Sequence, residues 1–345
     1  MLIERVSQQG EESWKIFVRA HCPPVGGFMQ SWDWGVFQES RNRKIERYFV
    51  IDGDAKVAAF TLVHYSLPFG IKYGYSPRGP IIAASYEGRF SEICRVIRAW
   101  AVKEFPRFIF LRIEPPLSFV PQDLLGSDFQ IPNYYIQPKY NHVIEIDRSE
   151  EEILKSFHSS TRSNISRAEK RGVTVEIKND ITADEYGSFT EMMRDTNSRN
   201  GGKNIYPDDE YFKSLFSALS RDDSATDNHN SLSLSVIYGY CDGNPAATYF
   251  VLFFGDTATY LYGGSRTKYL NSKVTTYLHW KAMLEAKRRG MRYYDLGGID
   301  QDIWPTLTEF KRQFKGREFS YIGNIDMPIR PLIYKIYNFL RRLKK

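Results

Sequence analysis

The sequence predicts an α/β (α+β) protein built from two similar halves, each a mixed, mainly antiparallel sheet flanked by helices. Short runs rich in aromatic and β-branched residues, typical of strands, alternate with longer amphipathic segments, typical of helices. The same order of elements then occurs twice. The turn glycines Gly53 and Gly243 lie 190 residues apart (243 − 53 = 190), which indicates a duplicated architecture.

Composition is that of a soluble globular protein. The chain has 345 residues, 42% hydrophobic and 26% charged, and this length suggests about two domains. No apolar run reaches the roughly 18 residues that a transmembrane helix needs, and residues 1–14 show no signal peptide. Cys22, Cys94 and Cys241 are far apart, and the histidines show no metal-ligand spacing. We therefore expect a cytoplasmic protein with no metal and no bound cofactor.

In the first half, apolar periodicity predicts the elements in a fixed order. They are helices at 13–20 and 33–40, strands at 47–51, 56–65 and 71–82, a helix at 86–104, and strands at 108–113 and 142–146. Pro115 and Pro116 end the strand at 108–113, and residues 115–140 are expected to be loop.

The second half repeats this order. Its elements are helices at 183–196 and 208–219, strands at 232–240, 248–254 and 257–262, a helix at 273–289 and a strand at 293–296. Two basic helices, 150–157 and 161–171, are expected between the halves. We place the first domain at 1–146 together with 326–345, and the second at 147–325.

Three strands, a helix and a strand form the core order of the GNAT acyltransferase fold. GNAT enzymes hold the pyrophosphate of CoA on a glycine-rich loop at a helix N-terminus, where free N–H groups meet the anion. The corresponding loop here, SRTKYLNS at 265–272, contains no glycine. A GNAT-like fold without an evident CoA loop suggests a different acyl donor.

A series of short motifs, each weak alone, occurs in an order that resembles the FemABX peptidyltransferases, twin-GNAT enzymes that use aminoacyl-tRNA. The motifs are QSWDWG (30–35), YSPRGP (75–80), TRSNISRAEKRGV (161–173), Thr196 with Arg199, YLYGGS (260–265), YYDLGGI (293–299) and FKRQFKG (310–316). The resemblance covers nearly the whole chain. Residues 200–243 show no long charged heptad segment, so we expect the compact type without a coiled-coil arm.

The resemblance implies an aminoacyltransferase of peptidoglycan cross-bridge synthesis. Aminoacyl-tRNA would be the co-substrate, and an amine of a precursor peptide the acceptor. Aminolysis of an ester builds negative charge on the carbonyl oxygen, which a cation or hydrogen-bond donors must stabilise. Lys311 matches the family lysine linked to catalysis, so we expect it to stabilise this oxyanion. Without the resemblance, Lys311 would be read as a solvated helix lysine, as Lys315 is.

Further residues carry over as substrate-binding positions. Thr196 and Arg199 match residues near the phosphates or peptide of the precursor, and arginine suits bidentate contact with anions. Tyr75 and Arg78 lie in a loop that the resemblance implies binds the nucleotide-sugar end. Arg78, between prolines and a glycine, has a structural role as its alternative.

Tyrosines of the second half complete the expected substrate-binding set. Tyr260 and Tyr262 alternate with Leu261 along a strand, so we expect them to share one face and line a peptide channel. Sheet packing is the alternative for this pair. Tyr211 is assigned to the same set, whereas Asp295 is expected to shape the strand end rather than transfer protons.

Two departures from the family pattern leave the acceptor open. Gln38 stands four residues after Trp34, where the family often has lysine, and PIIAAS at 80–85 lacks the acidic residue often found there. The acceptor is then a UDP-linked precursor, a lipid-linked precursor or a different amine. Two other classes of function also remain: a GNAT-type N-acyltransferase that uses acyl-CoA, and a non-catalytic twin-GNAT binding module.

The end of the chain is basic and amphipathic. Six basic residues and no acidic one follow Pro328, namely Arg330, Lys335, Arg341, Arg342, Lys344 and Lys345. One helical stripe holds five apolar residues, namely Leu332, Ile336, Phe339, Leu340 and Leu343. We favour a helix that docks this stripe onto the first half of a monomer. The alternative is that residues 331–345 contact the anionic inner face of the membrane, where a lipid-linked precursor would sit.

Overall fold

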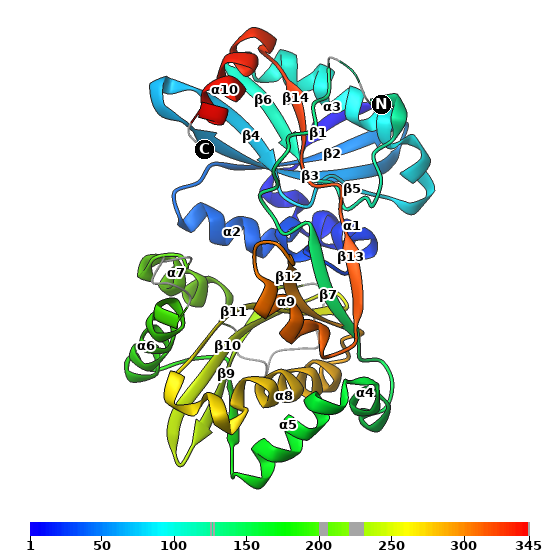
Figure 1. The fold of residues 1–345 in the computed structure, drawn as a ribbon. Helices are drawn as coiled ribbons and strands as arrows, with labels where there is room; N and C mark the ends of the chain where they lie inside the picture. The colour runs from blue at the N-terminus through cyan, green and yellow to red at the C-terminus, as the bar shows by residue number, and fades with distance from the viewer. Residues whose placement is uncertain (125, 127, 200–205, 221–230, 344–345) are drawn as a thin grey trace. The chain divides into compact units, whose positions relative to one another are not determined.

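The computed structural model divides into two compact units, one made of Met1–Lys139 with Ser320–Lys345 and the other of Tyr140–Phe319 (Figure 1). It describes residues 1–124, 126, 128–199, 206–220 and 231–343. Parts of the segment expected to lack a coiled-coil arm, 200–205 and 221–230, lie outside the described residues, as do Lys344 and Lys345.

The first unit is built on one sheet. Its strands are β1 (Leu2–Arg5), β2 (Ile45–Asp52), β3 (Ala55–Ser66), β4 (Lys72–Ser76), β5 (Ile81–Ile82), β6 (Phe108–Ile113) and β14 (Ile325–Pro328). They are ordered β1-β2-β3-β4-β6-β14, with β5 beside β3. The pair β4–β6 is parallel, and the other pairs are antiparallel.

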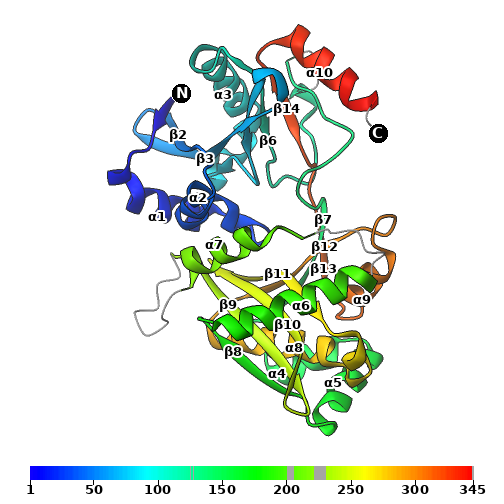
Figure 2. The same cartoon turned by 90° about the vertical axis from the view of Figure 1, so that its left-hand side faces the viewer.

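Helices cover both faces of this first sheet (Figure 2). They are α1 (Glu11–His21), α2 (Trp32–Ser40), α3 (Phe90–Glu104) and α10 (Pro331–Leu343). The apolar stripe of α3 packs on side chains such as Phe60 and Leu111. Alternate residues of the strands face the other way: Phe49 meets the rings of α1, and Phe110 meets Tyr334 of α10. The first core is therefore a sheet between two helical layers.

The second unit repeats this plan on a second sheet. Its strands are β7 (Tyr140–Glu145), β8 (Thr174–Lys178), β9 (Ser233–Cys241), β10 (Asn244–Phe254), β11 (Thr257–Ser265), β12 (Tyr293–Ile299) and β13 (Arg317–Ser320). They are ordered β13-β7-β12-β11-β10-β9-β8. The pair β11–β12 is parallel, whereas β7–β12, β9–β10, β10–β11 and β8–β9 are antiparallel.

Helices again lie on both faces of the sheet. They are α4 (Glu150–Ser156), α5 (Ser159–Lys170), α6 (Ala183–Arg199), α7 (Asp209–Leu219), α8 (Val274–Arg288) and α9 (Pro305–Arg312). Val251 packs in the cluster that contains residues of α5 and α8. Its neighbour Phe250 points the other way, stacks on Phe189 of α6 with ring centroids 4.4 Å apart, and meets Phe212 and Phe216 of α7.

Short 3₁₀ segments connect several of these elements, at Gln8–Gly10, Gly27–Gln30, Pro68–Gly70, Ala84–Arg89, Gln122–Leu124 and Thr267–Ser272. The predicted repeat of elements is present. The first unit contains α1-α2-β2-β3-β4-α3-β6, and the second contains α6-α7-β9-β10-β11-α8-β12. Gly53 and Gly243 lie in the corresponding hairpin turns and both adopt positive φ, +60° and +73°.

Two expectations about placement are corrected. The strand predicted at 142–146 is β7, which pairs with β12 in the second sheet, so residues 140–146 lie in the second unit. Residues 320–325, placed in the second domain from the sequence, lie in the first unit. Apolar alternation marks a strand but carries no information on its distant partner. The predicted docking stripe of the last helix is also wrong, because Leu332, Ile336, Phe339 and Leu340 are exposed and a different face of α10 packs on the sheet. The side chain of Leu343 lies outside the described residues.

Candidate active site

The second sheet opens between its two parallel strands. β11 and β12 are paired through Thr257–Thr259, and the last pair joins Thr259 to Asp295. Within the fully described range 257–299, β11 continues to Ser265 and β12 to Ile299 without further pairing between them. Backbone N–H and C=O groups that leave a ladder need other partners, so this opening is a natural place for polar ligand groups.

Lys311 lies at this opening. Pro305 begins α9, as suits a first helical turn, and the helix buries Thr308 and Lys311. The Nζ atom of Lys311 donates a hydrogen bond of 2.7 Å to the carbonyl oxygen of Gly298, beyond the last β11–β12 pair. Lys315 is exposed. The structure thus separates the two lysines of FKRQFKG into a buried one and a solvated one.

Burial sets the electrostatics of Lys311. It lowers the pKa of Lys311 from 10.5 to about 8, while the carboxylate of Asp295 opposes this shift. Asp295 is itself buried and accepts hydrogen bonds from the backbone N–H of Gly297 (2.7 Å) and from Asn141 Nδ2 (3.2 Å). The carboxylate therefore helps to shape the strand end and also supplies negative charge near the ammonium group.

Gly297 keeps the space around the lysine open. It adopts φ of +80°, and a Cβ atom there would lie 3.5 Å from Lys311 Nζ and 3.4 Å from the carbonyl oxygen of Tyr260. The backbone of Tyr260 and the ammonium group of Lys311 are thus brought to the same point. A small ligand group placed there would meet a cation and a strand backbone.

Tyr260 and Tyr262 lie on opposite faces of the sheet, so the prediction that they share a face is wrong. Phe250 is paired with Tyr262, but the next residue, Val251, is paired with Tyr260. Leu261 is thereby left as an extra residue in a β-bulge, and such an insertion changes the face on which the following residue lies. Tyr260, Leu261 and Tyr262 do alternate in the sequence, but a β-bulge cannot be recognised from that alternation.

The two tyrosines consequently have different neighbours. Tyr260 meets the rings of Tyr249 and His279 on the α8 side. Tyr262 lies on the α7 side, where its hydroxyl donates a hydrogen bond of 3.2 Å to Tyr211 Oη, and where Tyr206 is also a ring neighbour. Burial raises the pKa of Tyr262. Tyr211 and Tyr262 therefore form one aromatic group, and Tyr260 belongs with the core beneath Lys311.

Thr196 and Arg199 join the end of α6 to the end of β11. Thr196 Oγ1 accepts from the backbone N–H of Ser265 at 2.9 Å. The guanidinium group of Arg199 donates to the carbonyl oxygen of Ser265 (2.7 Å), to Ser265 Oγ (2.8 Å) and to Thr267 Oγ1 (2.9 Å). Asp195 forms an ion pair with the same group. Arg199, which was predicted to bind an anion of the precursor, is thus hydrogen-bonded and ion-paired to residues of its own chain.

Tyr75 and Arg78 lie in the first unit, where Gln30 holds their loop. Gln30 Nε2 donates to the carbonyl oxygen of Pro77, and Gln30 Oε1 accepts from the backbone N–H of Thr61 at 2.7 Å. The motifs QSWDWG and YSPRGP are therefore in direct contact through the side chain of Gln30. Tyr75 is buried and donates to Glu114 Oε2 at 2.7 Å. The tyrosine is therefore a packing residue as the chain stands.

Arg78 is only partly satisfied. Its Nη2 donates to the carbonyl oxygen of Pro138 at 2.7 Å, and its guanidinium carbon lies 4.7 Å from the ring centre of Tyr321. Its Nε and Nη1 are buried and have no acceptor among the residues that the structure describes. Buried donors without acceptors are costly, so an anionic group that reached these two atoms would be stabilised there.

Two buried histidines near the opening were not assigned a role from sequence. His279 Nδ1 lies 3.0 Å from Tyr294 Oη, and burial, with Lys311 nearby, lowers the pKa of this imidazole well below its usual range. His142 Nε2 accepts from the backbone N–H of Gly316 at 3.0 Å, and burial lowers its pKa to about 4. Both are therefore neutral core residues. The described residues hold no cluster of His, Cys, Asp or Glu suited to a metal ion.

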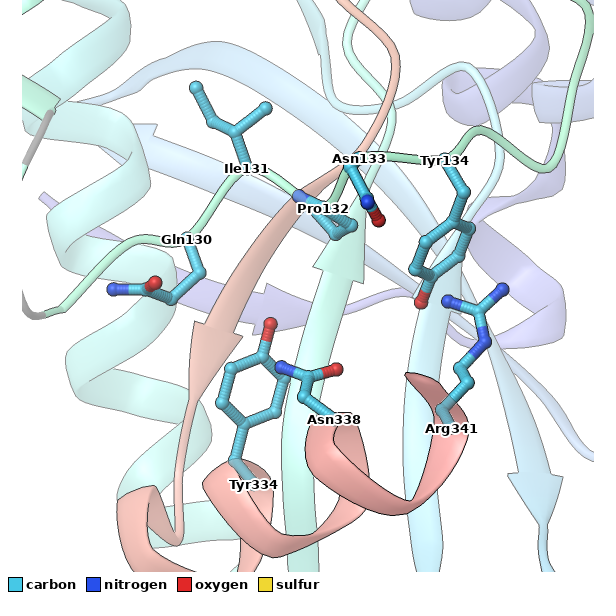
Figure 3. Close-up of a pocket in the computed structure, with 8 residues that line it drawn as sticks. All are labelled: Gln130, Ile131, Pro132, Asn133, Tyr134, Tyr334, Asn338 and Arg341. Atoms are coloured by element: carbon cyan, nitrogen blue, oxygen red, sulfur yellow. The ribbon is translucent and has the colours of Figure 1, made fainter. Parts of the chain in front are cut away.

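A separate pocket of about 220 Å³ lies in the first unit between residues 130–134 and α10 (Figure 3). Tyr334, Asn338 and Arg341 point into it from α10, opposite Tyr134. Behind it, Arg112 forms a buried ion pair with Asp326. This pocket includes none of the predicted site residues.

Comparison with known proteins identifies the family. A family model described as the FemAB family matches residues 11–133, 124–225 and 235–342. The chain belongs to the FemAB family. Among the relatives of this chain, a lipid II:glycine glycyltransferase of Staphylococcus haemolyticus (strain JCSC1435) is 24% identical over 266 residues, covering 59% of this chain and 61% of that protein. A Staphylococcus aureus protein of the same name is 24% identical over 285 residues, covering 61% and 64%. The chain thus matches less than two thirds of each relative's length.

Solved structures agree on the fold of this FemAB chain. The crystal structure of FemX matches with a TM-score of 0.79 at 18% identity, covering 97% of this chain and 99% of that one. A tandem GNAT protein from the clavulanic acid biosynthesis pathway matches with a TM-score of 0.56 at 11% identity, covering 95% and 98%. The predicted fold, two GNAT-like domains with mixed sheets, is confirmed.

Proposed function

We propose that this FemAB protein is an aminoacyltransferase that moves an amino acid from aminoacyl-tRNA to an amine of a lipid-linked peptidoglycan precursor. The observation that carries the proposal is the buried ammonium group of Lys311 at the opening between β11 and β12. The relatives are named for transfer of glycine to lipid II, which favours glycine as the amino acid and a lipid-linked acceptor over a UDP-linked one.

The chemistry is ester aminolysis. The neutral acceptor amine attacks the ester carbonyl carbon and forms a C–N bond, and the carbonyl oxygen becomes an oxyanion. The C–O bond to the tRNA ribose then breaks, and the proton lost by the amine passes to that leaving oxygen. Because the pKa of Lys311 is about 8, its ammonium form predominates at neutral pH and supplies the positive charge that the oxyanion needs.

The remaining N–H bonds of Lys311 make this role geometrically feasible. An ammonium group has three donors, and Gly298 O is the acceptor that the described residues provide. A water-poor, buried setting strengthens the attraction between the cation and an oxyanion. Holding both substrates in line at this point would contribute further to the rate.

Arg78 and Arg199 are the proposed anion contacts for the precursor. In the first unit, Arg78 holds two buried donors that have no acceptor among the described residues. In the second unit, an incoming phosphate would compete with Ser265 and Asp195 for Arg199. Tyr75, Thr196, Tyr211, Tyr260 and Tyr262 are proposed to shape these binding surfaces through packing and hydrogen bonds rather than to act on the reacting atoms.

The donor is proposed to be tRNA rather than CoA. The segment before α8 is a 3₁₀ turn, Thr267–Ser272, and Ser272 Oγ accepts the backbone N–H of Val274 at 3.3 Å. The N-terminus of α8 thus has a side-chain partner of its own and no glycine-rich loop to receive a pyrophosphate. Tight, stoichiometric CoA binding in calorimetry would favour the alternative, an acyl-CoA N-acyltransferase.

The test supplies both candidate donors and both candidate acceptors to the purified full chain. Glycyl-tRNA, a pool of other charged tRNAs and acetyl-CoA are each combined with lipid-linked and UDP-linked precursor, and products are weighed by mass spectrometry. We expect one added aminoacyl group on the lipid-linked precursor with a charged tRNA. Acetylated product alone would support the acyl-CoA enzyme, and the absence of any product would support a binding module.

Lys311→Met tests the proposed catalytic role. Loss of one oxyanion contact is expected to lower turnover by about 10²–10³. Lys315→Met is the matched control, because that lysine lies in the same motif but is exposed, and it should retain wild-type turnover. If the two variants have equal turnover, Lys311 has no part in the chemistry.

A further inference from the structure

The rotation of α10 about its axis is fixed by its inner face. Tyr334 donates a hydrogen bond of 2.7 Å to Asp326 Oδ2, and its ring meets Phe110. One and two turns later, Asn338 and Arg341 line the pocket opposite Tyr134 (Figure 3). Residues four and seven positions apart lie on one side of a helix, so this side of α10 is held against the first unit.

The opposite side of α10 is apolar and exposed. At 100° per residue, Leu332, Ile336, Phe339 and Leu340 lie about half a turn away from Tyr334. Their side chains are between 54% and 77% exposed. We call these four residues the outer stripe. Four large apolar side chains gathered on one exposed helix face mark a surface that meets another apolar phase.

The charges in the segment that carries the outer stripe are of one sign. Arg330 and Lys335 are exposed beside it, and the sequence after Pro328 contains six basic residues and no acidic one. A basic amphipathic helix with an apolar face is suited to lie in the plane of an anionic bilayer, with the apolar face among the acyl chains. No helix among the described residues is long and apolar enough to cross a membrane.

We propose that α10 is a membrane-surface anchor whose outer stripe inserts into an anionic lipid bilayer. The inference adds a partner to the proposed function, on which it rests for its purpose: an enzyme with a lipid-linked acceptor works at a membrane surface. The binding itself requires neither substrate nor turnover. Insertion is superficial, because the inner side of α10 stays packed on Phe110 and Asp326.

A bilayer fits the outer stripe better than a second copy of the chain. Two copies packed stripe to stripe about a two-fold axis would bring the same cationic residues together, with no carboxylate in the segment to neutralise them. Anionic headgroups instead neutralise these cations, each of which contributes attraction near the surface. Charge complementarity therefore selects lipid.

The test measures binding of the full chain to vesicles, without substrates, by flotation at low salt. Vesicles are phosphatidylcholine alone or phosphatidylcholine mixed with phosphatidylglycerol. We expect the wild type to bind the anionic vesicles at least about tenfold more tightly than the neutral ones. Ile336→Gln combined with Phe339→Gln should weaken binding to anionic vesicles by about thirtyfold or more. Lys335→Gln should weaken it by about fivefold.

The matched control is Ile16→Gln combined with Phe119→Gln. These side chains are 57% and 68% exposed and belong to the first unit but not to α10. The control should bind vesicles like the wild type, and both double variants should melt at the wild-type temperature because they change exposed positions. Equal loss of binding in both double variants, or none in either, overturns the proposal.

Sedimentation of the same proteins tests the alternative that a second copy of the chain covers the outer stripe. A wild-type dimer that the outer-stripe variant converts to a monomer, without vesicle binding by either, assigns the stripe to self-association and overturns the proposal. Transfer of the aminoacyl group to the lipid-linked precursor, dispersed in detergent without vesicles, is measured in parallel. Failure of that reaction refutes the proposed function, whereas failure of vesicle binding refutes only the anchor.

Discussion

Replacing Lys311 with methionine should change the pH dependence of stability in a way that only a buried lysine can. Burial lowers the pKa of Lys311 from 10.5 to about 8. At about 1.36 kcal/mol for each pH unit, this difference means that the protonated side chain opposes folding by about 3 kcal/mol at neutral pH. Methionine has a similar length and no charge, so the variant lacks this penalty at every pH.

The sign of the effect follows from the lowered pKa. The unfolded chain binds the proton more tightly than the folded chain, so the penalty is complete below about pH 8 and disappears as the pH rises towards 10.5. Relative to Lys311→Met, the wild type should gain about 2 kcal/mol of unfolding free energy between about pH 7.5 and about pH 10. The lost hydrogen bond to Gly298 adds a constant of about 1 kcal/mol, which cancels in the comparison.

Equilibrium urea unfolding of both proteins across this pH range is the assay. Other titrating groups, including the many tyrosines, are common to both proteins and cancel in the difference between them. Lys315→Met is the control, because it removes an exposed lysine of the same motif and leaves Lys311 in place. A pH-independent difference between the wild type and Lys311→Met would refute the reasoning, because it would show that Lys311 titrates alike in both states.

Three further outcomes are expected. Asp326→Asn should lower the free energy of unfolding by about 3–5 kcal/mol, because it leaves the buried Arg112 without its carboxylate; a loss below about 1 kcal/mol in urea unfolding would contradict this. Gly264→Ala should cost about 1–3 kcal/mol, since a Cβ would lie 2.8 Å from the backbone of Met192 in α6, and an unchanged melting temperature would show that α6 moves freely. Asp295→Asn should shift the limb of the pH–rate profile that reports Lys311 to lower pH, because the carboxylate raises that pKa; a shift to higher pH would exclude this coupling.

Local patterns predicted the elements well because those elements follow local rules. The apolar stripe of the helix expected at 86–104 is buried in α3, which spans Phe90–Glu104. The helix expected at 273–289 is α8, Val274–Arg288. Spacings of three and four residues place side chains on one face whatever the rest of the chain does, and the residues 90, 93, 94, 97 and 101 obey this rule.

Features that depend on contacts between residues far apart in the sequence could not be predicted from local patterns. The bulge at Leu261 exists because β11 must fit β10, and nothing in YLYGGS announces it. Lys311 is buried because α9 packs against β12, which lies elsewhere in the sequence. The residues next to Lys311 in the sequence therefore do not distinguish it from the exposed Lys315. The face of α10 that contains Tyr334 packs on the sheet, and the outer stripe does not. Tyr334 packs on Phe110 and also donates a hydrogen bond to the buried Asp326. A prediction made by counting apolar residues does not include this hydrogen bond of the tyrosine hydroxyl.

The last strand of the first sheet also sets the order in which the chain can be completed during synthesis. β14 pairs with β6, and their ion pair joins Arg112 to Asp326 across 214 positions. At about 5–20 residues per second, a ribosome needs roughly 10–40 s to deliver Asp326 after Arg112, and all of Tyr140–Phe319 emerges in that interval. The second unit is one continuous stretch of the sequence and can fold first. Until β14 is made, the edge of β6 has no neighbouring strand there and Arg112 lacks its partner Asp326. A premature stop shortly before Ile325 would therefore leave an unpaired strand edge on an otherwise nearly finished protein, a species suited to aggregation and to recognition by chaperones.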